Sequence, residues 1–174
     1  MNIRDFRPGD SAMLASIFHE AVHAVGSRDY SPEQVAAWSP APVPAEQFLA
    51  RISDGRSVFV AVTGSDAPIA FIELEEDGHI DCFYCSPEFV GHGVGKALYQ
   101  RLETAALAMG LSRLHVEASE AAGVRAKRRQ DPQLSYGKDL ALRARGSPLR
   151  REIRGQALPG ASRSAGLSAS AWSR

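Results

Sequence analysis

The chain has 174 residues, of which 44% are hydrophobic and 23% charged, a balance typical of one globular domain rather than a fibrous or wholly disordered protein. No run of about 18 apolar residues occurs, so we expect no membrane span, and the polar first ten residues lack the apolar stretch of a secretory signal. The sequence therefore predicts a cytoplasmic protein. Its formal net charge of zero offers no basic excess, which argues against nucleic acid as a partner.

The zero net charge conceals two chemically different parts of the chain. Residues 1–120 carry 8 Lys and Arg against 17 Asp and Glu, whereas residues 121–174 carry 12 against 3. The second part holds only 8 Ile, Val, Leu and Phe in 54 residues, too few large apolar groups to bury a core readily. We therefore predict a core domain over residues 1–120 and an atypical basic segment over residues 121–174.

Helix signals dominate the first third of the chain. Asp10 or Ser11 can cap a first helix by offering a side-chain oxygen to free backbone N–H groups. Ser31-Pro32 begins a second helix, with Pro at the first helical position. We expect a short edge strand over residues 2–7, followed by helices over residues 11–26, 32–38 and 46–52.

From residue 57 the pattern changes to β-branched and aromatic residues, which favours strands. We expect strands over residues 57–63, 68–74 and 79–85, with Asp77-Gly78 as a hairpin signal before the third. A helix ending at Gly110 and a further strand over residues 111–118 follow. Because a strand–helix–strand order needs a crossover connection, the last two strands should be parallel. The predicted architecture is α/β with a mixed sheet.

A glycine-rich segment, GHGVGK at residues 91–96, joins the third strand of this sheet to the following helix. Glycines let backbone approach a ligand closely, and the free N–H groups of a helix N-terminus favour an anion. The dinucleotide fingerprint fails because its third glycine would fall at Lys96, and the phosphate-loop pattern fails because Val90 stands in the place of its first glycine. On spacing alone, a phosphate site and an ordinary glycine-rich turn both remain open.

In its setting this segment resembles a known family. Residues 83–98, FYCSPEFVGHGVGKAL, are similar to the acyl-CoA signature of the GNAT acetyltransferases, Q/R-x-x-G-x-G/A after a strand and a Pro-containing loop. Val90 stands in the Q/R place, and Gly93 and Gly95 fill the two small positions. The order of elements also matches over about residues 1–122. The resemblance implies a GNAT-like α/β fold, with a mixed, mostly antiparallel sheet flanked by helices and a strand–loop–helix acyl-CoA motif.

The resemblance also implies the ligands and the residues that hold them. Acetyl-CoA would be the co-substrate, no metal would be needed, and the acceptor would be an amine of a small molecule or a peptide, with a homodimer left open. The residues that would surround the pyrophosphate are Gly91, His92, Gly93, Val94, Gly95 and Lys96. Those whose backbone would pair with the pantetheine arm are Phe83, Tyr84 and Cys85.

Members of this family work by direct attack of the acceptor amine on the thioester within one ternary complex. A free amine titrates near pH 10, so it must lose a proton to become nucleophilic at neutral pH. Asp81 is our first candidate for the base, and His79 and Glu117 are the second and third. The alternative is that Asp81 only caps a turn or pairs with a neighbour. Tyr30 and Trp38 are candidates to line the acceptor pocket, with packing as the alternative.

Two other motifs suggest metal or redox chemistry. His19-Glu20-Ala-Val-His23 matches H-E-x-x-H, which on a helix places two histidines on one face for zinc, with the glutamate as base. Only 18 residues precede it, too few for the sheet that such hydrolases place there, so we favour histidines beside a packed face. Cys82 and Cys85 lie three apart on a predicted strand and should point to opposite faces.

The resemblance stops abruptly after residue 122. The family pattern continues with an aromatic pair on a helix, where a tyrosine usually protonates the departing thiolate, but this chain reads GVRAKRR from residue 123. Three explanations are open: a basic extension that binds polyanions, a divergent substrate-binding end, or a change of reading frame, which we favour as a hypothesis. The departure keeps a non-catalytic acyl-CoA-binding protein as the alternative to an N-acetyltransferase.

Overall fold

A computed structural model of the chain describes residues 1–27, 30–119, 140–141 and 150–156. In this part of the chain the helices are α1 (Ser11–Gly26), α2 (Pro32–Trp38), α3 (Ala45–Ile52) and α4 (Val94–Ala108), with short 3-10 turns η1 (Pro8–Asp10) and η2 (Pro87–Phe89). The strands are β1 (Asn2–Asp5), β2 (Ser57–Val62), β3 (Pro68–Leu74), β4 (His79–Ile80), β5 (Phe83–Cys85), β6 (Arg113–Ser119), β7 (Leu140–Ala141) and β8 (Arg150–Gln156).

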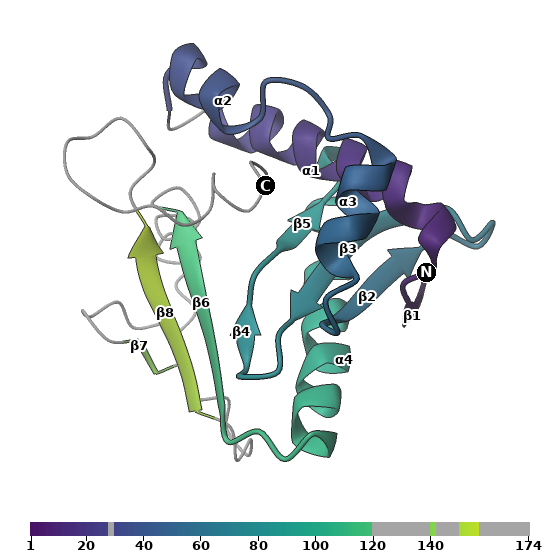
Figure 1. Ribbon diagram of the computed structural model, residues 1–174, viewed down its shortest axis with the longest axis vertical. Helices are drawn as coiled ribbons and strands as arrows, with labels where there is room; N and C mark the ends of the chain where they lie inside the picture. Colours follow the sequence, from purple (N-terminus) through teal and green to yellow (C-terminus); the bar gives the residue numbers. More distant parts are fainter. Residues whose placement is uncertain (28–29, 120–139, 142–149, 157–174) are drawn as a thin grey trace.

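The strands form a mixed sheet that is divided into two parts (Figure 1). One part has the order β1-β2-β3-β5, with antiparallel neighbours throughout. The other has the order β4-β6-β8-β7, in which β4–β6 and β6–β8 are parallel and β7–β8 is antiparallel. The predicted crossover is confirmed, since β4 and β6 are parallel on either side of α4 in the sequence. The predicted α/β fold with a mostly antiparallel sheet and flanking helices is confirmed as well.

The prediction of one continuous strand over residues 79–85 is wrong. A β-bulge interrupts it between β4 and β5. On one side of the interruption Glu75 N–H donates to His79 O, and on the other Ile72 pairs with Phe83. Three steps along β3 therefore face four steps along the opposite strand. Glu73 N–H donates to Cys82 O in the register of β5, so the extra residue is at Ile80-Asp81, opposite Leu74.

Helices cover both faces of the first part of the sheet. Successive side chains of β2 point to opposite faces, so they pack in two different buried clusters. Val58, Val60 and Val62 pack in one buried cluster with α1, α2 and α3. Phe59 and Ala61 pack in a second cluster, which holds the buried face of α4. Because both faces are covered, β2 and β3 are almost continuously apolar instead of alternating with polar residues. None of the helices in the described ranges is long and apolar enough to cross a bilayer.

The basic segment predicted over residues 121–174 contributes two described strands, β7 and β8. β8 pairs with β6 along seven positions, from Arg113 with Arg150 to Ser119 with Gln156. The rest of the predicted segment lies outside the described residues. Its boundary at residue 120 and the three explanations for its composition remain predictions.

Gly78 lies in the turn between β3 and β4, and its lack of a side chain lets this turn approach the start of β6 closely. Its φ of +90° is left-handed, and a Cβ there would lie 2.2 Å from the backbone oxygen of Arg113. Gly55 offers a matched comparison because its φ of +102° is also left-handed, but its Cβ would meet only the Glu76 carboxylate, at 3.8 Å.

We expect Gly55→Ala to lower the free energy of unfolding by about 1 kcal/mol, the cost of a left-handed alanine. Gly78→Ala should cost about 3 kcal/mol or more, because the backbone of β6 must also move. Urea denaturation of both variants measures the difference. Equal losses would mean that β6 does not approach the turn this closely.

Candidate active site

The extra residue at Ile80-Asp81 is followed by a separation of two strands. β4 pairs with β6 only through His79 with His115 and Ile80 with Val116. Beyond the bulge, β5 pairs with β3 alone, while β6 continues beside β8. Figure 1 shows β5 and β6 diverging from this point. One edge of β5 is therefore left without a strand partner among the described residues.

The register of β5 determines which backbone groups lie along this edge. Glu73 N–H donates to Cys82 O and Ser86 N–H donates to Ile69 O, both at 2.9 Å. Hydrogen-bonded pairs alternate along an antiparallel ladder, so Tyr84 directs its N–H and C=O towards β3. Phe83 and Cys85 direct theirs away from β3, towards the side on which β6 diverges. An extended ligand could pair with these two residues as a strand would.

The glycine-rich segment lies at the end of this free edge and begins α4. Gly93 occupies the position before the helix with a left-handed φ of +81°. Ala97 N–H donates to Gly93 O at 3.1 Å, so the N–H groups of Val94, Gly95 and Lys96 have no acceptor within the helix. Those groups, the helix dipole and the exposed Lys96 side chain all favour an anion.

The space around the segment is open enough for a ligand. A Cβ built at Gly91 or Gly93 would meet no atom of the described residues within 4 Å. The Phe83 ring packs 3.5 Å from the position a Cβ would take at Gly95, so the free strand edge and the helix N-terminus are direct neighbours. Val90, which stands in the Q/R place of the motif, is 45% exposed.

Comparison with known proteins gives this arrangement a family. A family model described as the acetyltransferase (GNAT) domain matches residues 27–124. The chain belongs to the GNAT acetyltransferase family.

Three relatives show how far the likeness extends. The uncharacterized N-acetyltransferase YafP of Escherichia coli K12 is 33% identical over 102 residues, and the match spans 59% of this chain and 65% of YafP. A GCN5-related N-acetyltransferase from Rhodopseudomonas palustris is 32% identical, with a TM-score of 0.67 over 87% of this chain and 91% of that one. PaiA N-acetyltransferase from Thermoplasma acidophilum, solved with coenzyme A, shares the fold at 19% identity, with a TM-score of 0.66 over 84% and 93% of the two chains.

Asp81 lies in the bulge of this GNAT sheet, where the two strands part. Its Oδ2 accepts hydrogen bonds from Arg51 Nη1 at 2.8 Å and from Arg56 Nη1 at 2.5 Å. Its Oδ1 accepts none from the part of the chain that the structure describes. The side chain is 23% exposed. The pairing of Asp81 with neighbours, which was the alternative to a catalytic role, is therefore present, while Oδ1 has no partner among the described residues. Its role as the base stays a prediction.

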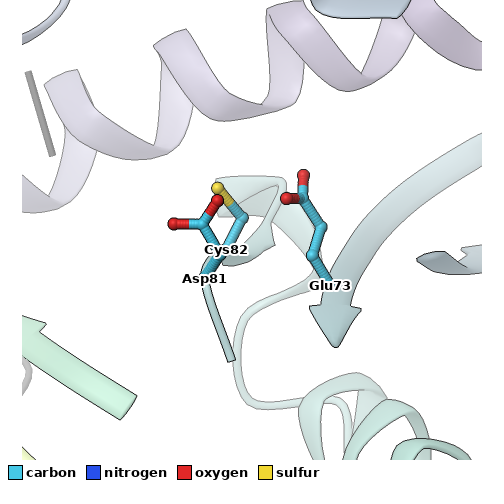
Figure 2. A group of neighbouring side chains, drawn as sticks. All are labelled: Glu73, Asp81 and Cys82. Carbon is cyan, nitrogen blue, oxygen red and sulfur yellow. The ribbon is translucent and has the colours of Figure 1, made fainter. Parts of the chain in front are cut away.

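Glu73 on β3 lies beside Asp81 and is fully buried (Figure 2). Arg51 Nη2 donates to its Oε1, and Arg56 Nη1 donates to its Oε2 at 2.8 Å. Burial raises the pKa of the Glu73 carboxyl, and the two guanidinium groups oppose that rise. Burial also opposes the charge on each arginine, but the surrounding groups outweigh it and raise the pKa of both above the usual value: Cys82 with Glu73 and Asp81 for Arg51, and the carboxylates for Arg56.

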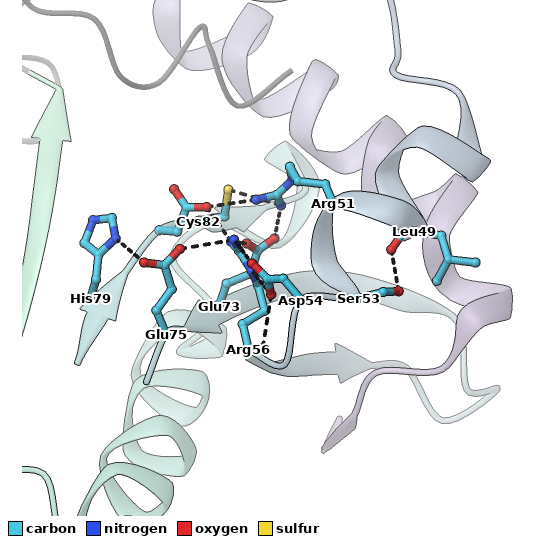
Figure 3. A network of polar contacts seen from close by, with 10 residues as sticks. Leu49, Arg51, Ser53, Asp54, Arg56, Glu73, Glu75, His79 and Cys82 are labelled. Carbon is cyan, nitrogen blue, oxygen red and sulfur yellow. Dashed lines mark hydrogen bonds and ion pairs between the residues drawn. The ribbon is translucent and has the colours of Figure 1, made fainter. Parts of the chain in front are cut away.

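Arg56 extends the network to the molecular surface (Figure 3). It donates to Asp54 through Nη2 at 2.6 Å and pairs with Glu75 at 3.1 Å. Glu75 in turn pairs with His79 at 3.0 Å, and the His79 ring stacks on His115 with ring centroids 5.0 Å apart. His79, a second candidate base, is therefore tied to Glu75 at the rim of the same network.

The third candidate base, Glu117, lies on β6, and the orientation of its side chain is outside the described part of the structure. Tyr30 and Trp38 make an edge-to-face ring contact with centroids 6.4 Å apart and pack against the first buried cluster. That contact fits the packing alternative, with Trp38 at the end of α2 and Tyr30 just before its start.

The H-E-x-x-H motif has a structural use in this fold. His19 Nδ1 is 2.8 Å from Ser39 Oγ, and His23 Nε2 is 2.8 Å from Ser39 O. Burial and the neighbouring His23 lower the pKa of His19. Glu20 is exposed. Through these hydrogen bonds to Ser39 the two histidines connect the C-terminal end of α2 to α1, as expected of histidines beside a packed helix face.

Cys82 and Cys85 pack on opposite faces of the sheet, as predicted: Cys82 belongs to the first cluster, and Cys85 packs against the second. Burial raises the pKa of both thiols and disfavours a reactive thiolate. Glu73, Asp81 and Cys82 bring three potential ligand atoms within 4.8 Å of one another. Arg51 and Arg56 already engage both carboxylates there, so a cation would have to displace two guanidinium groups.

Sequence reasoning missed Arg51, Arg56 and Glu73. One signal was available for Glu73, because it is the only charged residue among the apolar neighbours of strand 68–74, PIAFIEL. A carboxylate in a strand buried on both faces needs a cation beside it. Nothing in the spacing indicates which arginine supplies that charge.

The Asp54–Arg56 pair gives a pH-dependent contribution to stability. The hydrogen bond from Arg56 lowers the pKa of Asp54 from 3.8 to about 2. A depressed folded-state pKa stabilises the fold above the unfolded value and loses that effect as the pH falls through about 2. We expect Asp54→Asn to lower the free energy of unfolding at pH 7 by less than about 1 kcal/mol, since the Asp54 side chain is 47% exposed.

Denaturation of wild type and Asp54→Asn at pH 7, 4 and 2 tests this. The difference in the free energy of unfolding between the two proteins should be full at pH 7, begin to shrink below about pH 4 and be largely gone at pH 2. A difference that is independent of pH would contradict the pairing.

Proposed function

We propose that the chain transfers an acetyl group from acetyl-CoA to an amine of a small molecule or a peptide. One observation carries this proposal: the free edge of β5 adjoins the N-terminus of α4, where a ligand with an extended arm and an anionic group would find partners for both. The backbone groups of Phe83 and Cys85 suit an extended amide-containing arm, and the N–H groups of Val94 to Lys96 suit a pyrophosphate. Acetyl-CoA has both parts.

The residues proposed for the co-substrate then divide by role. Gly91, His92 and Gly93 lead into α4 and leave the approach to its N-terminus open, and Lys96 adds positive charge. Phe83 and Cys85 would bind the pantetheine arm through their backbone. Tyr84 would contribute differently from the family expectation, because its backbone groups face β3 and its ring packs against Phe18 with centroids 4.9 Å apart.

An arm running along β5 from α4 places the thioester near the bulge, beside Asp81. Acetyl-CoA supplies an activated acetyl group; the amine nitrogen forms the new bond to the acetyl carbon, and the carbon–sulfur bond breaks. Asp81 Oδ1 accepts the proton of the substrate ammonium, directly or through one water. As the amide forms, the nitrogen gives up a second proton to solvent and the departing thiolate takes one from solvent, so the products are the acetylated amine and CoA.

Titration calorimetry with acetyl-CoA tests the binding half of the proposal. We expect one saturable site, with binding at least about tenfold weaker in Gly93→Glu and in Lys96→Glu, because each adds negative charge beside the pyrophosphate. Lys96→Glu places no side chain on a left-handed residue, so it separates charge from backbone strain. Gly64→Glu adds the same charge in the open turn between β2 and β3 and should bind like wild type. No binding by folded wild-type protein would overturn the proposal.

Release of CoA thiol in the presence of a panel of amines tests the catalytic half. We expect acceptor-dependent release by wild type and a kcat about 100-fold lower in Asp81→Asn, with KM for acetyl-CoA changed little. Asp66→Asn is the matched control, because Asp66 is also held by two arginines, Arg4 and Arg7, but in the turn between β2 and β3.

Saturable binding without release for any amine would favour the non-catalytic acyl-CoA-binding alternative. That alternative draws its support from the departure of residues 123–129 from the family pattern. An Asp81→Asn variant with wild-type kcat would remove Asp81 as the base.

A further inference from the structure

Arg51 connects α3 to the two carboxylates of the site (Figure 3). Its Nη1 donates to Asp81 at 2.8 Å, and its Nη2 donates to Glu73. The guanidinium also lies over the Phe48 ring, 5.4 Å from its centroid, and the side chain is 8% exposed. A planar guanidinium directs its donors at fixed angles, so the bond from Arg51 to the buried Glu73 sets the position of the donor that Arg51 offers to Asp81.

Asp81 needs such a support because the sheet does not provide one. It is in the bulge, between the last residue pair of β4 with β6 and the first pair of β5 with β3. Both arginine contacts are made to Oδ2, which leaves Oδ1 to point elsewhere. The arginines therefore determine which oxygen is presented where the strands part.

Stability alone is a weak reason for this cluster. Two arginines and two carboxylates are taken from water here, and the desolvation cost of such groups often exceeds the attraction between them. An apolar group of the same volume could fill the space at equal or lower cost. Unlike an apolar group, the two arginines hold the anionic carboxylate of Asp81 where β5 and β6 separate.

We propose that Arg51 is a positioning residue for acetyl transfer, acting through Asp81 by orienting its carboxylate. The inference rests on the proposed function and on Asp81 as the base. Arg56 shares the task but also binds Asp54 and Glu75 at the surface, so Arg51 is the cleaner residue to test.

A double-mutant cycle between Arg51→Lys and Asp81→Asn tests the proposal. Lysine keeps the charge beside Glu73 and loses the two-pronged geometry. We expect Arg51→Lys to lower kcat about tenfold in the wild-type background, to leave KM for acetyl-CoA within about twofold, and to have no further effect in Asp81→Asn. Arg101→Lys is the matched control, because Arg101 also lies over a phenylalanine ring, 4.2 Å from the centroid of Phe59, and pairs with one aspartate, Asp5.

The outcomes separate the possible failures. Equal fold losses of kcat in both backgrounds, or an unchanged kcat in Arg51→Lys, would overturn the positioning role while leaving the transferase intact. No acceptor-dependent release by wild type would overturn the proposed function, and the positioning role would fall with it. If Arg51→Lys does not fold, Arg51→Met with Glu73→Met removes the buried charges as a pair, and the same cycle with Asp81→Asn applies.

Discussion

One extra residue, at Ile80-Asp81, determines which strands pair in the middle of this sheet. Without it, a single strand over residues 79–85 would pair with β3 on one side and could pair with β6 along its whole length on the other. With it, the pairing with β6 ends at Ile80, and the backbone of Phe83 and Cys85 is left facing the diverging strand. The separation, the free edge and the position of Asp81 all follow from this one irregularity.

The neighbouring polar cluster connects three segments of the chain beside the bulge. Arg51 comes from the last turn of α3, Arg56 from the loop before β2, and Glu73 from β3, so three segments meet at one buried carboxylate. Glu73 is 0% exposed, and removing either arginine would leave one oxygen of the buried carboxylate without its donor. The cluster thus ties α3 to the sheet beside the site and holds Asp81 through the same contacts.

Much of this fold could be predicted from sequence, because its signals are local. Ser31 caps α2 and Pro32 begins it, as expected, and Pro68–Leu74 forms β3 with its predicted bounds. The glycine-rich segment could be located because glycine spacing and the following helix are adjacent in sequence. The bulge could not, because no Gly or Pro marks it. The cluster at Glu73 could not be assembled either, since Arg51 is 22 residues away and only the folded sheet brings them together.

The central claim is that acetyl-CoA completes the free edge of β5, and amide hydrogen exchange with and without acetyl-CoA tests it most directly. The account predicts that ligand slows exchange at Phe83, Cys85 and the first turn of α4. Tyr84, whose N–H already faces β3, should be slow in both states. Unchanged exchange at Phe83 and Cys85 under saturating acetyl-CoA would show that the ligand does not pair with this edge, and would contradict the account.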